Sequence, residues 1–273
     1  MALGTAFVVG YPVQQDGKQS IPLIVTAKHV VNGQKRITLK FKAKETSKAK
    51  TVAIPYDLAE LKSAGDLWEH SDPTVDLVVF RTMVPEEADF QVIPMSLVAS
   101  RKTYEDSDIK ETDRVVFPSL LVGLEGLSRD YPVVREGTIA LIPEEPIPFG
   151  TSRSELVLIN AAANQGSSGS PVFLWPGPRI NRGTFTIGGS APALLGVVEG
   201  FFNSIPRELR AIDTVSKQPV PLGLTTNTDP PHPIFLGFAE DSRIGCYTPA
   251  WLLREILEGG GLGGRMKALG ASN

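Results

Sequence analysis

The sequence lacks several features that would assign it to common classes of protein. It has one cysteine, Cys246, among 273 residues, so an internal disulfide cannot form and zinc sites built on paired cysteines are excluded. Lysine and arginine number 27 and aspartate and glutamate 30, so the net charge of −3 provides no overall basic field for a nucleic acid. The longest uncharged stretch, 156–178, contains asparagine, glutamine and serine side chains, which excludes a membrane span. Neither a nucleic-acid partner nor a membrane span is therefore expected.

Long helical patterns are also absent, and aromatic residues make up only 7% of the chain. Glycine (26 residues) and proline (22 residues) are frequent instead, which favours short strands joined by turns. The clearest amphipathic helix is predicted over Pro249–Glu258. Short apolar runs rich in Val, Ile and Phe predict strands at Thr5–Val9, Pro22–Thr26, Arg36–Phe41, Asp76–Phe80, Arg114–Phe117, Val133–Ile142, Leu156–Asn160, Ser170–Trp175, Thr184–Ile187 and Leu194–Val198.

A polar segment near the middle of the chain separates two groups of predicted strands. It lies at 97–112 and carries several charged side chains, so we interpret it as a connection between two domains, 1–96 and 113–247. The predicted helix follows at 248–258. The tail 259–273 begins with residues that are nearly all glycine, and it is expected to be flexible.

Three short motifs contain residue types used in acyl transfer. Gly166-Ser167-Ser168-Gly169-Ser170-Pro171 places a serine between glycines, which allow a sharp turn with a projecting hydroxyl and converging amide groups. Taken alone, such a motif is more often a simple turn between two strands. A serine hydroxyl also needs a base, and His29 follows an apolar run that ends near Ala27. Asp76 opens another apolar run, where its carboxylate needs a hydrogen-bond donor such as a histidine ring N–H.

Taken together, these motifs resemble the trypsin-like serine peptidases, especially the disulfide-free bacterial branch that includes the HtrA-type proteases. The resemblance implies an all-β fold of two six-stranded antiparallel β-barrels, each with a small core, and a C-terminal helix. The active site would then lie in the cleft between the barrels. The segments that carry the resemblance are Gly4–Val9, Val25–Val31, Val75–Val79, Gly166–Pro171 and Leu195–Val198.

The resemblance also implies a role for each motif. His29 would be the general base, Asp76 would fix its tautomer, and Ser168 would be the nucleophile that forms an acyl-enzyme. The amides of Gly166 and Ser168 would form the oxyanion hole. The expected activity is that of a serine endopeptidase acting on polypeptides, without a metal or organic cofactor.

Three positions depart from the family pattern. Ser167 is neutral where many secreted trypsins have an aspartate that pairs with a new N-terminus, so activation by that ion pair is not expected. Ser170 replaces a common glycine, which should be tolerated if its φ is negative. Glu199 replaces a small polar residue, and its carboxylate would raise the pKa of Asp76 or His29.

The resemblance also indicates where substrate selectivity would arise. No acidic residue lies at the expected base of the primary specificity pocket, so small or medium apolar side chains are expected before the cleaved bond. The residues assigned to substrate binding are Ala162, Ala163, Gln165, Glu199, Gly200 and Phe201, and the last three would pair with extended substrate.

Two other interpretations remain open. An α/β-hydrolase could use Ser168 with Asp213 and His232, but that fold needs a helix directly after the serine, and Pro171 begins a predicted strand there. A pseudo-protease would keep the fold as a peptide-binding module. His70 and His232 lie in polar loops and are interpreted as solvated. The beginning of the chain has no basic and apolar signal segment, which favours a cytoplasmic location, and the oligomeric state is left open.

Overall fold

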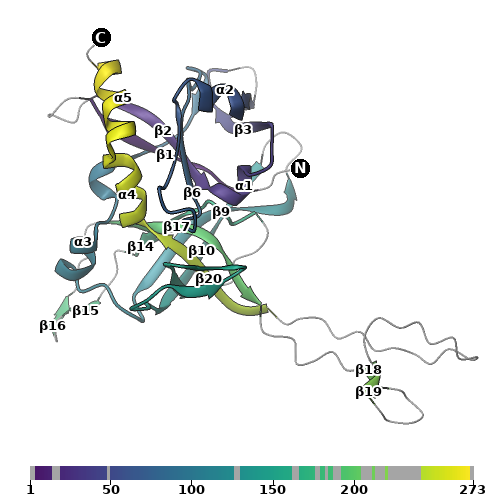
Figure 1. Cartoon of the computed structure of the whole chain (residues 1–273), viewed down its shortest axis with the longest axis vertical. Helices are drawn as coiled ribbons and strands as arrows, with labels where there is room; N and C mark the ends of the chain where they lie inside the picture. Colours follow the sequence, from purple (N-terminus) through teal and green to yellow (C-terminus); the bar gives the residue numbers. More distant parts are fainter. Residues whose placement is uncertain are drawn as a thin grey trace, which may run out of the picture.

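The computed structural model describes residues 4–13, 19–47, 50–125, 130–161, 166–175, 179–181, 184–186, 192–203, 211–212, 219–220 and 241–270. The fold is mostly β, with two groups of strands and a pair of helices at the C-terminal end (Figure 1). None of the described helices is long and apolar enough to cross a membrane.

The first half of the chain forms two sheets. A five-stranded sheet has the order β5-β6-β2-β1-β8, and a three-stranded sheet has the order β4-β3-β7. Strands β1 and β8 pair in parallel. The elements are β1 (Phe7–Pro12), β2 (Ser20–Ala27), α1 (Lys28–Val31), β3 (Arg36–Ala43), β4 (Thr51–Asp57), α2 (Leu58–Ser63), β5 (Leu67–Glu69), β6 (Leu77–Arg81), β7 (Ala88–Asp89) and β8 (Val92–Pro94).

The closed six-stranded barrel expected for the first half is not shown, because the described strands of this half form two separate sheets. In the central sheet, alternate residues face opposite sides, and Val8, Ile24 and Phe80 are in register across β1, β2 and β6. Their side chains form a small apolar cluster with partly buried residues of the three-stranded sheet. Strand β3 presents its basic residues outward and is only partly buried, and within the described chain it pairs with β4 and β7 alone. The two sheets therefore pack face to face instead of forming one continuous ladder.

The second half contains the closed six-stranded barrel that was expected there, with the order β10-β13-β20-β17-β14-β9. Three two-stranded sheets accompany it. The elements are η1 (Met95–Leu97), α3 (Arg101–Asp106), β9 (Arg114–Glu125), β10 (Asp130–Leu141), β11 (Ile147–Phe149), β12 (Ser152–Ser154), β13 (Val157–Asn160), β14 (Pro171–Leu174), β15 (Arg179–Asn181), β16 (Thr184–Thr186), β17 (Leu194–Asn203), β18 (Ala211–Ile212), β19 (Pro219–Val220), β20 (Asp241–Pro249), α4 (Ala250–Glu258) and α5 (Gly260–Gly270).

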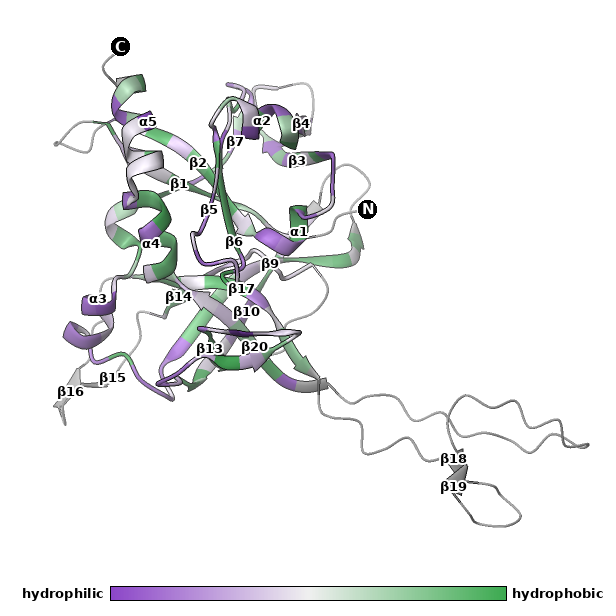
Figure 2. Ribbon diagram, in the orientation of Figure 1, coloured by the Kyte–Doolittle hydropathy of each residue, from purple (hydrophilic) through white to green (hydrophobic). Residues whose placement is uncertain are grey.

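The two halves share one large core. A contiguous cluster of buried residues contains Val9, Leu23 and Val79 of the first half together with Phe117 and Val197 of the barrel. The expectation of a separate core in each half was therefore wrong, because one face of the central sheet packs against barrel residues. Hydrophobic residues are prominent along β1, β2, β6 and α4 in Figure 2, whereas α3 is mostly polar.

The glycine-rich end of the chain also differs from expectation. Residues 260–270 form helix α5, which follows α4 after a break at Gly259 (Figure 1). Leu262 and Met266 on α5 are buried in the common core, and Arg265 binds Asp66 at 3.1 Å. The composition predicted flexibility because glycine disfavours helix in isolation, but tertiary packing of the two apolar side chains holds this segment as a helix.

Candidate active site

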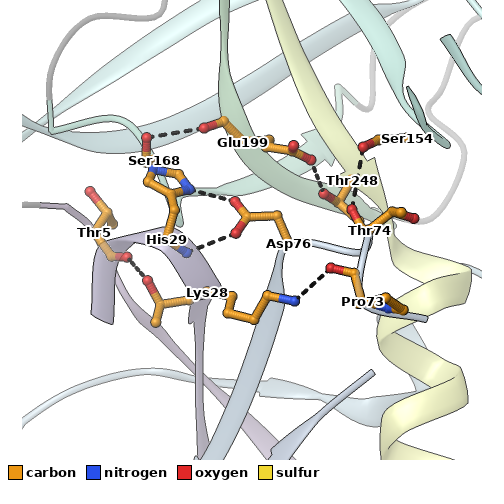
Figure 3. A network of polar contacts seen from close by, with 11 residues as sticks. Thr5, Lys28, His29, Pro73, Thr74, Asp76, Ser154, Ser168, Glu199 and Thr248 are labelled. Atoms are coloured by element: carbon orange, nitrogen blue, oxygen red, sulfur yellow. Dashed lines mark hydrogen bonds and ion pairs between the residues drawn. The ribbon is translucent and has the colours of Figure 1, made fainter. Parts of the chain in front are cut away.

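Two elements of the first half bring His29 and Asp76 together. Strand β2 ends at Ala27, and the chain then makes the single helical turn α1, which carries His29. Asp76 immediately precedes β6, the strand that pairs with β2. The carboxylate of Asp76 contacts His29 twice, through Oδ2 to ring Nδ1 at 2.5 Å and through Oδ1 to the backbone amide at 2.7 Å (Figure 3). The ring is fixed by one nitrogen, and Nε2 is left to face the cleft.

This contact favours the protonated form of the histidine. The hydrogen bond that the ring donates to Asp76 raises the pKa of His29 above its ordinary value, partial burial opposes this rise, and the charges of Asp76 and Glu199 add to it. The ring remains half exposed, with 50% of its side-chain surface accessible. His29 is therefore an accessible base whose positive form is stabilised by carboxylates.

Ser168 lies on a tight loop before strand β14. Gly166 and Gly169 both have positive φ, 97° and 85°, which other residues adopt only with strain. A Cβ at Gly169 would lie 2.0 Å from the Thr5 carbonyl oxygen, so this loop also requires glycine for space. Among the described residues, the amides of Gly166 and Ser168 donate to no acceptor. Of these two residues, Ser168 lines the cleft described below.

The hydroxyl of Ser168 donates to the backbone carbonyl of Glu199 at 3.1 Å (Figure 3). Within the described chain, no hydrogen bond joins this hydroxyl to His29. A serine side chain rotates between staggered positions at low cost, so this hydroxyl can leave the Glu199 carbonyl by a change of rotamer.

Thr5 links the serine loop to the rest of the molecule. Its amide donates to the carbonyl of Ser168 at 2.8 Å, and its Oγ1 donates to the carbonyl of Gly166 at 2.8 Å. The same Oγ1 accepts from the amide of Leu120 at 2.9 Å, and the Thr5 carbonyl accepts from Thr26 Oγ1 at 2.7 Å. One residue of the first half therefore joins strand β2, strand β9 and the serine loop.

A cleft of about 510 Å³ lies over these groups. The β11–β12 turn at 149–152 forms one wall, and α1 and the loop before Asp76 also line the cleft. Gly200 and Phe201 line it as well. The ring of Phe149 stacks edge to face on Phe202, and a Cβ at Gly200 would lie 3.1 Å from that ring.

The sequence model of the trypsin-like peptidase domain matches residues 4–175 of this chain. The chain belongs to the trypsin-like peptidase family. Family membership supports a serine protease, and the single cysteine makes this domain free of internal disulfides. A search of the curated proteins finds no match.

Solved protease structures resemble this trypsin-like peptidase domain at low sequence identity. One is the MamO protease domain of Magnetospirillum magneticum, with 16% identity, 73% of this chain and 85% of that chain covered, and a TM-score of 0.41. Another is the Rv3671c protease of M. tuberculosis in its active form, with 14% identity, 94% of this chain and 80% of that chain covered, and a TM-score of 0.43.

The site residues predicted for the trypsin-like peptidase differ in how the structure places them. His29, Asp76, Ser168, Glu199, Gly200 and Phe201 all line the same cleft. Ala162, Ala163 and Gln165 lie outside the described residues, as do Asp213 and His232 of the α/β-hydrolase alternative. That alternative also needs a helix after Ser168, where the structure has β14, so it is wrong.

Sequence reasoning missed several contributors. The wall at 149–152 and the role of Thr5 depend on contacts between distant segments, and only the Phe-Gly-Thr turn signal was visible in the sequence. The solvated interpretation of His70 was wrong, because its ring is buried and its Nε2 contacts Glu255 Oε2 on α4 at 3.0 Å. The described residues include no group of histidine, cysteine, aspartate and glutamate side chains suited to a metal ion.

Proposed function

We propose that this chain is a serine endopeptidase that uses Ser168, His29 and Asp76 as a catalytic triad. The observation that carries the proposal is the double contact of Asp76 with His29, at the ring and at the backbone, in the cleft that Ser168 also lines. Two contacts fix both the tautomer and the orientation of the ring, which is what a general base for a serine hydroxyl requires.

The proposed reaction begins when the Ser168 hydroxyl rotates from the Glu199 carbonyl toward His29. Nε2 of His29 takes the proton while Oγ bonds to the carbonyl carbon of the substrate, and the oxygen becomes an oxyanion. His29 then gives the proton to the leaving amine as the C–N bond breaks. Water, activated by the same histidine, hydrolyses the acyl-enzyme and regenerates Ser168.

We assign the oxyanion hole to the amides of Gly166 and Ser168. Their N–H groups have no acceptor among the described residues, and the loop that carries them is fixed by Thr5. Preorganised backbone donors of this kind stabilise developing charge without reorganisation during the reaction. Gly200 and Phe201 would pair with the extended substrate, and the β11–β12 turn would limit its path.

The proposed preference is for small or medium apolar side chains before the cleaved bond. It rests on Ala162, Ala163 and Gln165, which supply no acidic group to attract lysine or arginine. The substitution Ala162→Asp should move cleavage of a peptide library toward lysine and arginine, and an unchanged library profile would contradict the assignment of that pocket position.

A fluorophosphonate probe tests the central proposal. The probe should label the intact protein at Ser168, and mass spectrometry of the labelled peptide identifies the site. Labelling should be lost in Ser168→Ala and strongly reduced in His29→Ala, whereas Ser167→Ala, next to the proposed nucleophile, should retain it.

Two outcomes would contradict the proposal. Labelling that persists in Ser168→Ala would assign the nucleophile elsewhere. A folded protein that is not labelled at any pH, but still binds peptides, would favour the pseudo-protease, for which the hydrogen bond from Ser168 to the Glu199 carbonyl is the supporting observation.

A further inference from the structure

The carboxyl group of Glu199 lies beside the His29–Asp76 pair because of a β-bulge in strand β17. The pairing of β17 with β20 joins Val198 to Tyr247 and Gly200 to Cys246, so Glu199 is the extra residue between them. A bulge changes the direction of a side chain, and bulges are frequent next to active sites. Here the bulge lies at Glu199, a residue that lines the cleft.

Glu199 is buried and has a specific partner. It is 8% exposed, and Thr248 Oγ1 on β20 donates to its Oε2 at 2.7 Å (Figure 3). Thr248 itself is 1% exposed, so this hydrogen bond is formed away from bulk water. The backbone carbonyl of the same glutamate accepts the Ser168 hydroxyl. Glu199 is therefore in contact with the serine through its backbone and close to the other two triad residues through its side chain.

The charged and titratable groups around Glu199 come from three elements. Asp76 precedes β6, His29 and Lys28 are on α1, and Cys246 is on β20. The pKa of Glu199 is raised to about 7, and burial is the strongest cause. Asp76 also raises this pKa, whereas the Thr248 hydrogen bond and the charges of His29 and Lys28 lower it. The Glu199 charge in turn raises the pKa of His29. Glu199 and His29 thus influence each other's protonation, and His29 must be deprotonated to act as a general base.

We propose that Glu199 is a positioning residue whose carboxyl group sets the pH range in which His29 works as a general base. The ionised carboxyl favours the protonated, inactive form of the imidazole, so it moves activity to higher pH. This role rests on the proposed function of His29. It uses only the charge of Glu199, which takes no part in bond formation.

Two substitutions test this role through the pH dependence of kcat/KM. Glu199→Gln keeps the shape and the Thr248 hydrogen bond but removes the charge, so the acidic limb of the profile should move to lower pH by about 0.5 to 1 unit. Thr248→Val removes the bond that favours the ionised carboxyl, so Glu199 should stay neutral to higher pH and the limb should move in the same direction. Glu136→Gln, at an exposed carboxylate on β10 that pairs with Arg114, is the matched control and should leave the limb unchanged.

An NMR titration measures the same effect without catalysis. The chain has only three histidines, His29, His70 and His232, so the ring signals can be assigned by substitution. In a Ser168→Ala background, Glu199→Gln should lower the midpoint of His29 and leave those of the other two histidines in place.

The outcomes separate this inference from the proposed function. Absence of wild-type activity together with the His29 shift would contradict the peptidase proposal and support the coupling of Glu199 to His29. Wild-type activity with an unmoved acidic limb and an unmoved His29 midpoint in folded Glu199→Gln would overturn the role of Glu199. Circular dichroism and the urea midpoint show whether each variant is folded. If Glu199→Gln does not fold, Thr248→Val decides the test.

Discussion

Thr5 shows how a single polar residue can hold a catalytic loop in place. Its Oγ1 satisfies the Gly166 carbonyl and the Leu120 amide at once, and its backbone binds Ser168. Its own side chain has no chemical role in the proposed reaction. Its role is therefore structural, because it holds the loop that would form the oxyanion hole.

Thr5→Val should weaken both the fold and the loop. The isosteric change leaves the Gly166 carbonyl and the Leu120 amide without a partner, which costs about 1–3 kcal/mol of the free energy of unfolding. We expect kcat to fall more than KM changes, because the loop that carries the oxyanion donors is loosened. Thr5→Ser keeps the hydroxyl and should restore most of both quantities. Equal urea midpoints and equal kcat for the two variants would contradict this account.

Glu199 should also make stability depend on pH. The unfolded carboxyl titrates near 4.5, but burial raises the folded pKa to about 7, so the folded state binds a proton that the unfolded state releases. Stability should therefore fall as the pH rises from about 4.5 through about 7, by about 3 kcal/mol at about 1.4 kcal/mol per pH unit.

Urea unfolding of the wild type and Glu199→Gln across this range measures the effect. Below about pH 4.5 both states of the wild type are protonated at this site, so the pH-dependent difference between the two proteins should be absent there. The difference in the free energy of unfolding between the two proteins should then change in favour of Glu199→Gln as the pH rises, and this change should be complete above about pH 7. Parallel stability curves would show that the carboxyl is not desolvated in the folded state.

At the scale of elements, helix α5 forms although its sequence is rich in glycine. Gly264 lies on an exposed part of this helix, and a Cβ there meets no atom within 4 Å. Gly259 differs, because a Cβ there would lie 2.9 Å from the Glu255 carbonyl oxygen. At Gly264 glycine only lowers the stability of the helix, whereas at Gly259 it is needed because a side chain has no space.

Gly264→Ala should stabilise the protein and Gly259→Ala should not. Alanine in a helix interior is favoured over glycine by about 1 kcal/mol, so the first substitution should raise the urea midpoint accordingly. Gly259→Ala must displace the backbone of α4 and should therefore lower the urea midpoint. A reduced midpoint for Gly264→Ala would mean that α5 is not helical in solution.

Local patterns in the sequence were sufficient to predict several strands and to single out the residues of the proposed triad. Apolar runs with turn signals predicted β2, β6 and the first half of β17. The aspartate before β6 was singled out because a carboxylate at the start of a buried strand needs a donor. The bulge at Glu199 and the wall at 149–152 could not be predicted, because both depend on the register between strands distant in sequence. The first half was expected to form a barrel from the family resemblance, and its register instead gives two sheets.

At the scale of the whole molecule, the proposed triad is divided between the two halves. His29 and Asp76 belong to the first half and Ser168 to the second, so their mutual geometry depends on how the halves pack. The common core and Thr5 contribute to this packing, and the C-terminal helices add two ionic contacts with the first half. His70 binds Glu255 on α4, and Arg265 on α5 binds Asp66. The loop from His70 to Asp76 is thereby attached to α4.

Leu262→Ala should test whether α5 helps to hold the first half in place. Leu262 is 1% exposed and belongs to the common core, so truncation should cost about 2–5 kcal/mol of the free energy of unfolding. Its neighbours on α5 lie near the first half, because a Cβ at Gly261 would lie 3.9 Å from Trp68 and a Cβ at Gly263 would lie 3.6 Å from Tyr11. If α5 supports the first half, hydrogen exchange should increase in β1 and β5, and probe labelling of Ser168 should slow because His29 and Asp76 are less well placed. Lys267→Ala, on the exposed side of α5, should change neither quantity. If Leu262→Ala loses stability but hydrogen exchange in β1 and β5 does not change, α5 does not support the first half.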